Sequence, residues 1–241
     1  MKTILKTDKG RIRENNEDSL LVDNQEQIFL LADGMGGHQA GEVASKIAVD
    51  SAYAYLKGKI SNSIPDQEEI TRSLVEALYT AHDAIKEKAE QSPDLTGMGT
   101  TFIGLVIKDG KAFICHIGDS RVYLFRDGIT QITQDQTWGA ALLQNNILTK
   151  EQIPRQKWHT LTQAVGVSET LIPEIKQIEL SFDDILLLCS DGLTDMLSDE
   201  EIEELLQKNR DLEQTANKFI SQANKKGGRD NISLILIKMS D

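Results

Sequence analysis

Four aspartates occupy similar places in the sequence, each beside a run of apolar residues long enough to form a strand. They are Asp33, Asp119, Asp191 and Asp230. An acidic side chain at a strand end can face a shared cleft while the strand itself stays dry. If the four ends converge, the carboxylates repel one another, and a bound divalent cation is the usual way for such a cluster to stay ionised. The pattern predicts a metal site, although for any one aspartate alone the capping of a turn is the simpler interpretation.

The residues around these aspartates indicate which metal and which further ligand to expect. Oxygen ligands without accompanying Cys or His favour Mg²⁺ or Mn²⁺ over zinc. In Asp33-Gly34-Met35-Gly36-Gly37 the glycines permit close approach of the backbone, so a carbonyl can join the carboxylate as a ligand. The same loop lacks the Lys-Ser/Thr of a P-loop and the spacing of a dinucleotide fingerprint, which argues against nucleotide binding.

An arginine near the N-terminus is a candidate for binding phosphate. Arg13 precedes Asn15, Asn16, Glu17 and Asp18. A guanidinium can hold two oxygens of a phosphate in one plane, which a lysine cannot do. The alternative is a surface ion pair between Arg13 and the neighbouring acids, and the local sequence does not separate the two interpretations.

Positioning these side chains requires strands, and the sequence contains apolar runs of strand length that are rich in Ile, Val, Leu and Phe. The runs are Ile28–Ala32, Phe102–Ile107, Ala112–Ile117, Arg121–Phe125, Ile185–Cys189 and Ile232–Ile237. Two connections carry Asp-Gly, at Asp109-Gly110 and Asp127-Gly128, a pair that tolerates the positive φ angles of tight hairpins. The strands are therefore predicted to pair antiparallel.

Four segments instead show the spacing of amphipathic helices, at residues 44–55, 70–89, 202–206 and 212–223. Capping-box spacing precedes two of them, at Asp66 with Glu69 and at Ser198 with Glu201. Strands interrupted by helix pairs favour an α+β fold in which the two pairs cover the outer faces of a two-sheet sandwich. Residues 138–166 fit neither period, and we expect a surface excursion with short helices there.

Composition limits the possible partners and location. The chain has 241 residues, and we expect one domain over residues 1–241. Its 38 acidic and 26 basic residues make nucleic acid a poor candidate partner. It has no run of 18 apolar residues and no signal peptide, so we expect no membrane insertion and a cytoplasmic protein. Cys115 and Cys189 lie in apolar runs and are interpreted as buried thiols rather than as a disulfide or a nucleophile.

Six short blocks resemble the protein phosphatase 2C family in its small bacterial form, in the family's order and over almost the whole chain. They are RENNED at 13–18, ADGMGGHQAGE at 32–42, GTT at 99–101, IGDSR at 117–121, SDGLTD at 190–195 and GRDNI at 228–232. The resemblance implies an αββα sandwich of two antiparallel sheets between helix pairs, which agrees with the layering inferred above. Residues 138–166 resemble the family's flap.

The resemblance also implies a role for each site residue. Asp33 would bridge two metals and the Gly34 carbonyl would complete the first site. Asp191 and Asp230 would hold the second metal, with Glu17 and Asp18 acting in the outer shell. Asp119 with Asp191 is similar to a third metal site of bacterial relatives, and Arg13 would bind the substrate phosphate.

The implied activity is hydrolysis of phosphoserine and phosphothreonine in proteins by a water that bridges two Mg²⁺ or Mn²⁺ ions. The expected partners are phosphorylated proteins and a serine/threonine kinase that opposes the enzyme, and we expect a monomer. Two alternatives stay open at this point. One is a non-catalytic phosphoprotein-binding module of the same fold, and the other is a phosphatase for small phosphate esters.

Two positions depart from the family pattern. Animal relatives carry a His, a proposed general acid, directly after the Asp-Gly pair, where this chain has Met35. His38 is the nearest substitute, although it could instead pack at the helix start while a metal-bound water protonates the leaving group. In Asp135-Gln136-Thr137, Gln136 replaces a His found in many relatives, which leaves substrate access open.

Overall fold

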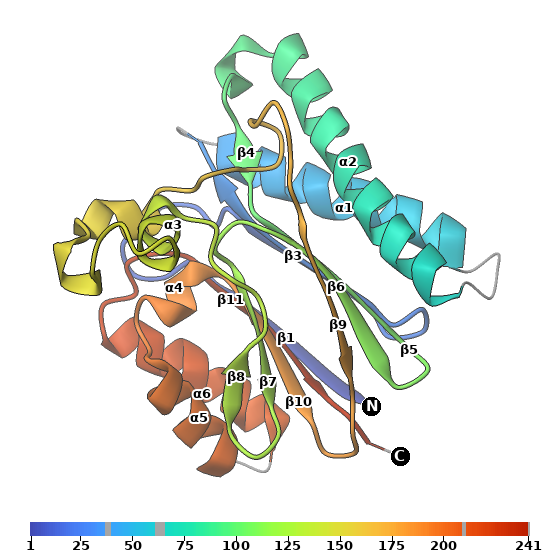
Figure 1. Cartoon of the computed structure of the whole chain (residues 1–241), viewed down its shortest axis with the longest axis vertical. Helices are drawn as coiled ribbons and strands as arrows, with labels where there is room; N and C mark the ends of the chain where they lie inside the picture. The colour runs from blue at the N-terminus through green and yellow to red at the C-terminus, as the bar shows by residue number, and fades with distance from the viewer. Residues whose placement is uncertain (37–39, 61–65, 209–210, 241) are drawn as a thin grey trace.

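A computed structural model describes residues 1–36, 40–60, 66–208 and 211–240 of the chain, and Figure 1 draws them as two facing β-sheets between two layers of helices. One sheet has the order β1 (Lys2–Asp8), β11 (Ile232–Lys238), β10 (Ile185–Cys189), β7 (Arg121–Phe125), β8 (Ile129–Gln131). The other has the order β2 (Asp18–Asp23), β3 (Ile28–Met35), β5 (Phe102–Lys108), β6 (Lys111–Ile117), β9 (Glu174–Glu179), and the short β4 (Gly99–Thr100) pairs with β3. All of these strand pairs are antiparallel, as predicted.

Helices cover the outer face of each sheet. The helices α1 (Ala40–Ile60) and α2 (Gln67–Gln91) pack together against the sheet that contains β3. The helices α5 (Asp199–Lys208) and α6 (Leu212–Lys225) lie on the other side, where α6 packs on β1 and β11. The predicted α+β sandwich with outer helix pairs is therefore the observed architecture.

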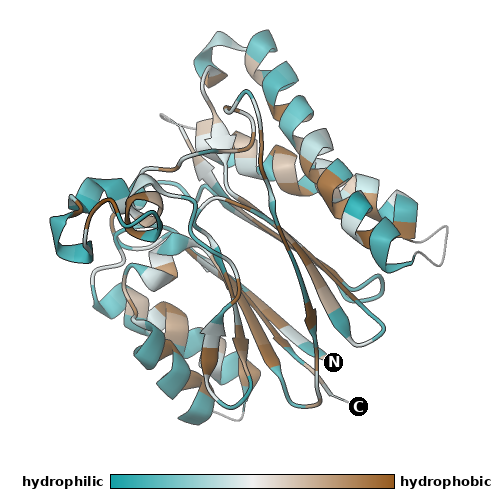
Figure 2. Ribbon diagram, in the orientation of Figure 1, coloured by the Kyte–Doolittle hydropathy of each residue, from teal (hydrophilic) through white to brown (hydrophobic). Residues whose placement is uncertain are grey.

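Burial on both faces explains why the central strands read as continuous apolar runs. Along β3, Ile28 and Leu30 join the core beneath α1 and α2. The alternate residues Phe29 and Leu31 join a second core between the two sheets. A third core, which includes Phe219 of α6, lies beneath the opposite helices. Figure 2 shows the result as hydrophobic strands in the middle of the molecule and hydrophilic outer faces on the helices.

Local signals in the sequence account for several element ends. The Asp66 side chain accepts a hydrogen bond of 2.8 Å from the backbone N–H of Glu69 at the start of α2. Ser198 and Glu201 form the reciprocal pair of a capping box before α5. These contacts satisfy N–H groups that a helix leaves without an internal partner.

Only one of the two Asp-Gly turns uses positive φ angles, although both connect antiparallel strands. Asp109 and Gly110 have φ angles of 48° and 71° between β5 and β6, as tight hairpins require. Asp127 and Gly128 also connect antiparallel strands, β7 and β8, but neither has a positive φ. The predicted antiparallel pairing is confirmed at that site as well, where a hydrogen bond from Arg126 N to Gly128 O closes the connection.

Two edge strands of the sheets, β1 and β9, were not anticipated. Both β1 and β9 are edge strands in which exposed residues alternate with half-buried ones, so neither contains a long apolar run. β3 also continues past Ala32 to Met35. Within the described part of the chain, no helix is long and apolar enough to span a membrane.

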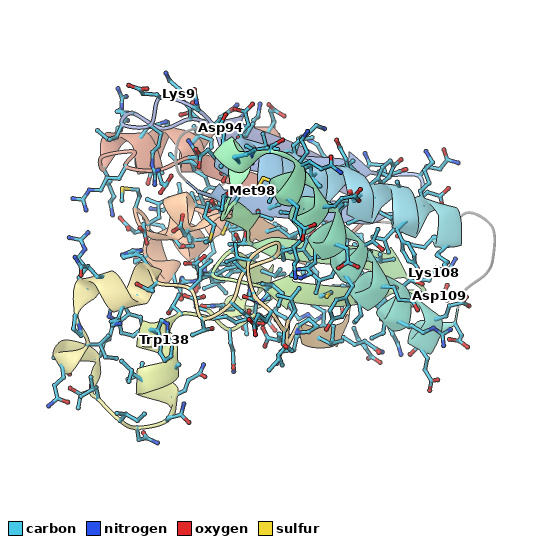
Figure 3. The ribbon with its side chains drawn as sticks, turned by 90° about the horizontal axis from the view of Figure 1, so that it is seen from above. Lys9, Asp94, Met98, Lys108, Asp109 and Trp138 are labelled. Carbon is cyan, nitrogen blue, oxygen red and sulfur yellow. The ribbon has the colours of Figure 1, made fainter. Side chains whose placement is uncertain are left out.

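Residues 138–166 contain α3 (Trp138–Gln144) and two 3₁₀ helices, η2 (Lys150–Gln152) and η3 (Arg155–His159). Isolated bridges of Thr100 with Val165 and of Thr137 with Leu161 tie the base of this excursion to the sandwich. In Figure 3 the excursion carries Trp138 at the end of the molecule opposite the hairpin turn at Asp109. It therefore stands beside the strand ends that carry the predicted acidic residues.

Candidate metal centre

A cavity of about 780 Å³ opens where the two sheets end, and carboxylates dominate its lining. The acidic side chains that line it are Glu17, Asp33, Asp119, Asp191, Asp195 and Asp230. Gly34 and Arg13 line it as well. The structure thus brings together all the described residues that the sequence singled out, except Asp18.

Both sheets contribute acids to this cavity. Asp33 lies in β3 of one sheet, whereas Asp191 follows β10 and Asp230 precedes β11 in the other sheet. Asp119 lies in the short loop from β6 to β7, where the chain crosses from one sheet to the other. The cavity is therefore a junction between the two halves of the sandwich.

Hydrogen bonds hold the Asp33 backbone on both sides. Its N–H donates to Thr101 Oγ1 at 2.9 Å, and its carbonyl accepts from Thr101 N at 2.9 Å and from Thr100 Oγ1 at 2.8 Å. The GTT block at 99–101 thus fixes the strand end that presents Asp33. A side chain supported in this way is pre-organised for binding.

Close backbone approach at Gly34 makes a larger residue impossible without displacement of its neighbours. A Cβ on Gly34 would overlap the carbonyl oxygens of Gly41 and Glu17. The Gly34 N–H also donates to the Glu17 carbonyl at 3.1 Å. The close approach predicted for this glycine is therefore present.

Asn231 ties the N-terminal segment to β11. Its side-chain oxygen accepts from Glu17 N at 2.8 Å, and its Nδ2 donates to the carbonyls of Lys9 and Asn15 at 3.0 and 2.9 Å. Arg13 lies in the segment held in this way, and its Nη2 donates to Asp230 Oδ2 at 2.6 Å. The ion-pair alternative for Arg13 is thus realised, with an aspartate that also lines the cavity.

The ionised forms of these aspartates are disfavoured unless a positive charge lies beside them. Burial first, and repulsion by neighbouring aspartates second, raise the pKa of Asp33 and Asp191 well above the ordinary value. The same causes raise the pKa of Asp119 to about 7. Burial raises the pKa of Asp18 to about 6, and one of its oxygens, Oδ1, is buried without a hydrogen-bond partner in the described chain. A group of oxygen donors whose negative charge lacks a compensating positive charge fits divalent cations.

Asp18 lies next to the cavity and not in its wall. It pairs with Asp33 across β2 and β3, and its Oδ2 accepts from Ser190 Oγ at 2.9 Å. Ser190 immediately precedes Asp191 and caps the short helix α4 (Asp191–Thr194). Asp18 therefore links two of the acid-bearing segments from behind.

Several cavity residues escaped the sequence analysis. Asp195 lies one helical turn after Asp191, and that spacing within SDGLTD could have identified it. His159 Nδ1 lies 3.5 Å from Asp195 Oδ2, and Arg155 and Arg229 also line the cavity. His159 and Arg155 come from the aperiodic excursion, which gave no such signal. His38 lies outside the described residues.

An acidic cavity between two sheets, with arginines beside it, defines a candidate metallohydrolase. Residues 10–236 match the profile of the family described as protein phosphatase 2C. A serine/threonine phosphatase stp of Listeria monocytogenes is 38% identical over 241 residues, which cover 97% of this chain and 94% of that protein. The chain belongs to the protein phosphatase 2C family.

Solved structures agree with this assignment over the whole chain. The crystal structure of the Mycobacterium tuberculosis serine/threonine phosphatase PstP/Ppp matches with a TM-score of 0.89 at 35% identity, covering 100% of this chain and 99% of that one. The PstP catalytic domain in complex with two manganese ions matches with a TM-score of 0.86 at 35% identity, covering 100% and 98%. The PstP sequence is longer, and the match spans 44% of it.

Proposed function

We propose that this chain hydrolyses phosphoserine and phosphothreonine in proteins and that it uses two Mg²⁺ or Mn²⁺ ions. The observation that carries the proposal is the convergence of carboxylates from both sheets, most of them half-buried, on one cavity that also holds Arg13. Family membership and the relatives' description as serine/threonine phosphatases support the same conclusion.

We infer the ligand roles from the resemblance to the family. Asp33, supported on both sides by Thr100 and Thr101, would bridge the two ions, and the Gly34 carbonyl would complete the first site. Asp191 and Asp230 would hold the second ion. Asp119 with Asp191 would form a third site, with Glu17 and Asp18 in the outer shell of the pair. The orphaned oxygen of Asp18 and the raised pKa values of Asp33, Asp119 and Asp191 support the presence of cations beside these residues.

The chemistry divides between the ions and the chain. When bound, the ions polarise the phosphoryl group and lower the pKa of water at the site. Arg13 binds the phosphoryl oxygens and offsets their charge, oriented by its bond to Asp230. The thiols do not serve as nucleophiles, because Cys115 and Cys189 are fully buried and burial raises the pKa of each to about 12.

The remaining features stay predictions. Met35 lines the cavity and cannot donate a proton, so His38 stays a candidate general acid beside solvent water. Residues 138–166 would act as a flap over the cavity within one domain that spans residues 1–241. A role in signalling opposite a kinase, a monomeric state and a cytoplasmic location are expectations from the sequence.

Phosphate release from a phosphothreonyl peptide tests the proposal. We expect turnover with Mn²⁺, none in EDTA, and near-complete loss in Asp191→Ala. Asp94→Ala removes an exposed aspartate away from the cavity and should leave turnover unchanged. Normal activity in Asp191→Ala would reject the site. Tight binding of the phosphopeptide without phosphate release at any Mn²⁺ concentration would instead identify a non-catalytic binding module, and a higher kcat/KM for small phosphate esters than for phosphopeptides would identify a metabolite phosphatase.

A further inference from the structure

Two arginines that line the cavity have no anionic partner among the described residues. Arg155 belongs to η3 of the excursion and Arg229 to the turn before β11, and both side chains are exposed and line the cavity. Among residues 1–36, 40–60, 66–208 and 211–240, neither guanidinium forms a hydrogen bond or an ion pair. The charge of Arg155 acts on Asp195, but the two groups do not make contact. Both guanidiniums are therefore free to bind an anion from outside the protein.

The third arginine of the cavity behaves differently. Arg13 is already bonded to Asp230 and is assigned to the substrate phosphoryl group. Elsewhere Arg121 pairs with Asp135 and Arg126 pairs with Asp184. In a chain with 38 acidic and 26 basic residues, acidic partners for an arginine are plentiful. Arg155 and Arg229 differ from the remaining exposed arginines in lining the cavity, where a bound phosphopeptide would meet them.

The excursion that carries Arg155 differs in charge from the rest of the chain. Residues 138–166 contain Lys150, Arg155 and Lys157 against a single acid, Glu151. At physiological ionic strength the field of the remaining negative charge is screened over about 8 Å. Groups in direct contact with a bound peptide therefore decide which flanking residues it prefers, and around this cavity Arg155 and Arg229 are such groups.

We propose that Arg155 and Arg229 bind anionic groups next to the phosphorylated residue, so that the enzyme selects phosphopeptides with acidic flanks. The inference rests on the proposed function, because it concerns the substrate of the same cavity. A guanidinium can donate two parallel hydrogen bonds to either a carboxylate or a phosphate. The flanking anion is thus a Glu or Asp side chain or a second phosphate.

Three phosphothreonyl peptides of equal length test the proposal in saturating Mn²⁺. The first has glutamates on both sides of the phosphothreonine, the second has glutamines there, and the third has one flanking glutamine replaced by a second phosphothreonine. We expect the wild type to favour an anionic peptide over the glutamine peptide by about fivefold in kcat/KM, as one or two exposed ion pairs would give. The anionic peptide with the higher value identifies which anion is preferred.

The double variant Arg155→Gln, Arg229→Gln should reduce this preference to less than about twofold, because it removes the one or two exposed ion pairs that produce the preference. Arg72→Gln, an exposed arginine of α2 outside the cavity, removes one positive charge and should keep the preference. Each ratio is measured within one variant, so differences in the folded fraction cancel. Equal kcat/KM for all three peptides in the wild type, or a preference that survives in the double variant, would overturn the inference alone. No phosphate release from any of them or from an aryl phosphate would overturn the proposed function and the inference with it.

Discussion

Replacing Asp119 by Asn should stabilise the metal-free protein at alkaline pH. Asp119 is only 8% exposed, and burial followed by repulsion from Asp135 raises its pKa from 3.8 to about 7. A shift of about three pKa units means that the ionised carboxylate destabilises the folded state by at most about 4 kcal/mol. Water penetration and relaxation reduce such penalties, so we expect a gain of about 2 kcal/mol, or roughly 4–8 °C in Tm for a chain of this size.

The pH dependence of this gain follows from the direction of the shift. The folded state holds the Asp119 proton more tightly than the unfolded state, so the contribution of Asp119 to wild-type stability is largest below pH 4 and is lost as the pH rises through about 7. The advantage of Asp119→Asn should therefore be full at pH 8 and less than half as large at pH 5. Mn²⁺ should reverse the order, because the wild type retains a proposed ligand that the variant lacks.

Thermal unfolding in EDTA and in Mn²⁺, at pH 5 and pH 8, measures these effects. Asp94→Asn serves as the control, since it removes the same charge from an exposed position and should change stability by less than about 0.5 kcal/mol. A lower Tm for metal-free Asp119→Asn at pH 8, or an equal change at both pH values, would show that Asp119 is not electrostatically strained.

Three further outcomes are expected. Gly34→Ala should destabilise the fold by more than about 2 kcal/mol and weaken the Mn²⁺-dependent rise in Tm, because its Cβ would overlap backbone oxygens. Gly58→Ala, in the last turn of α1 where an added Cβ meets no other atom, should stabilise by about 0.5–1 kcal/mol. Cys115 and Cys189 should react with a thiol reagent at pH 8 only as fast as the protein unfolds, since burial raises the pKa of both to about 12, and faster labelling of the native state would contradict their burial. Arg13→Lys should lower kcat/KM for phosphopeptides at least tenfold, because an ammonium cannot match the planar fork of a guanidinium; unchanged kinetics would remove Arg13 from the phosphate site.

The sequence predicted the middle of the fold better than its edges. Central strands such as β3 are buried on both faces, so their apolar runs were visible, and the helices α2 and α5 carried their own capping signals. Edge strands such as β1 and β9 need no continuous apolar run and were missed. The turn at Asp127-Gly128 shows that a dipeptide permits a conformation without requiring it.

The site was most predictable where its acids adjoin apolar strands. Asp33, Asp119, Asp191 and Asp230 were found because each adjoins a strand, and the fold brought these strand ends together at one cavity. Arg155 and His159 come from a segment without period, and only three-dimensional packing places them there. Arg229 lay beside a predicted ligand, but sequence order does not show that its side chain lacks a partner.

Because acids from both sheets meet at the cavity, cation binding and the cohesion of the two halves are thermodynamically linked. Ions held between Asp33 on one sheet and Asp191 and Asp230 on the other would oppose any sliding of the two layers. Linkage is reciprocal: if bound cations stabilise the packing of the two sheets, then loosening that packing weakens the binding of the cations. A substitution in the core between the sheets, at Phe29 or Leu31 for example, would therefore lower cation affinity. Residues remote from the cavity thus share in setting how much free cation the protein needs.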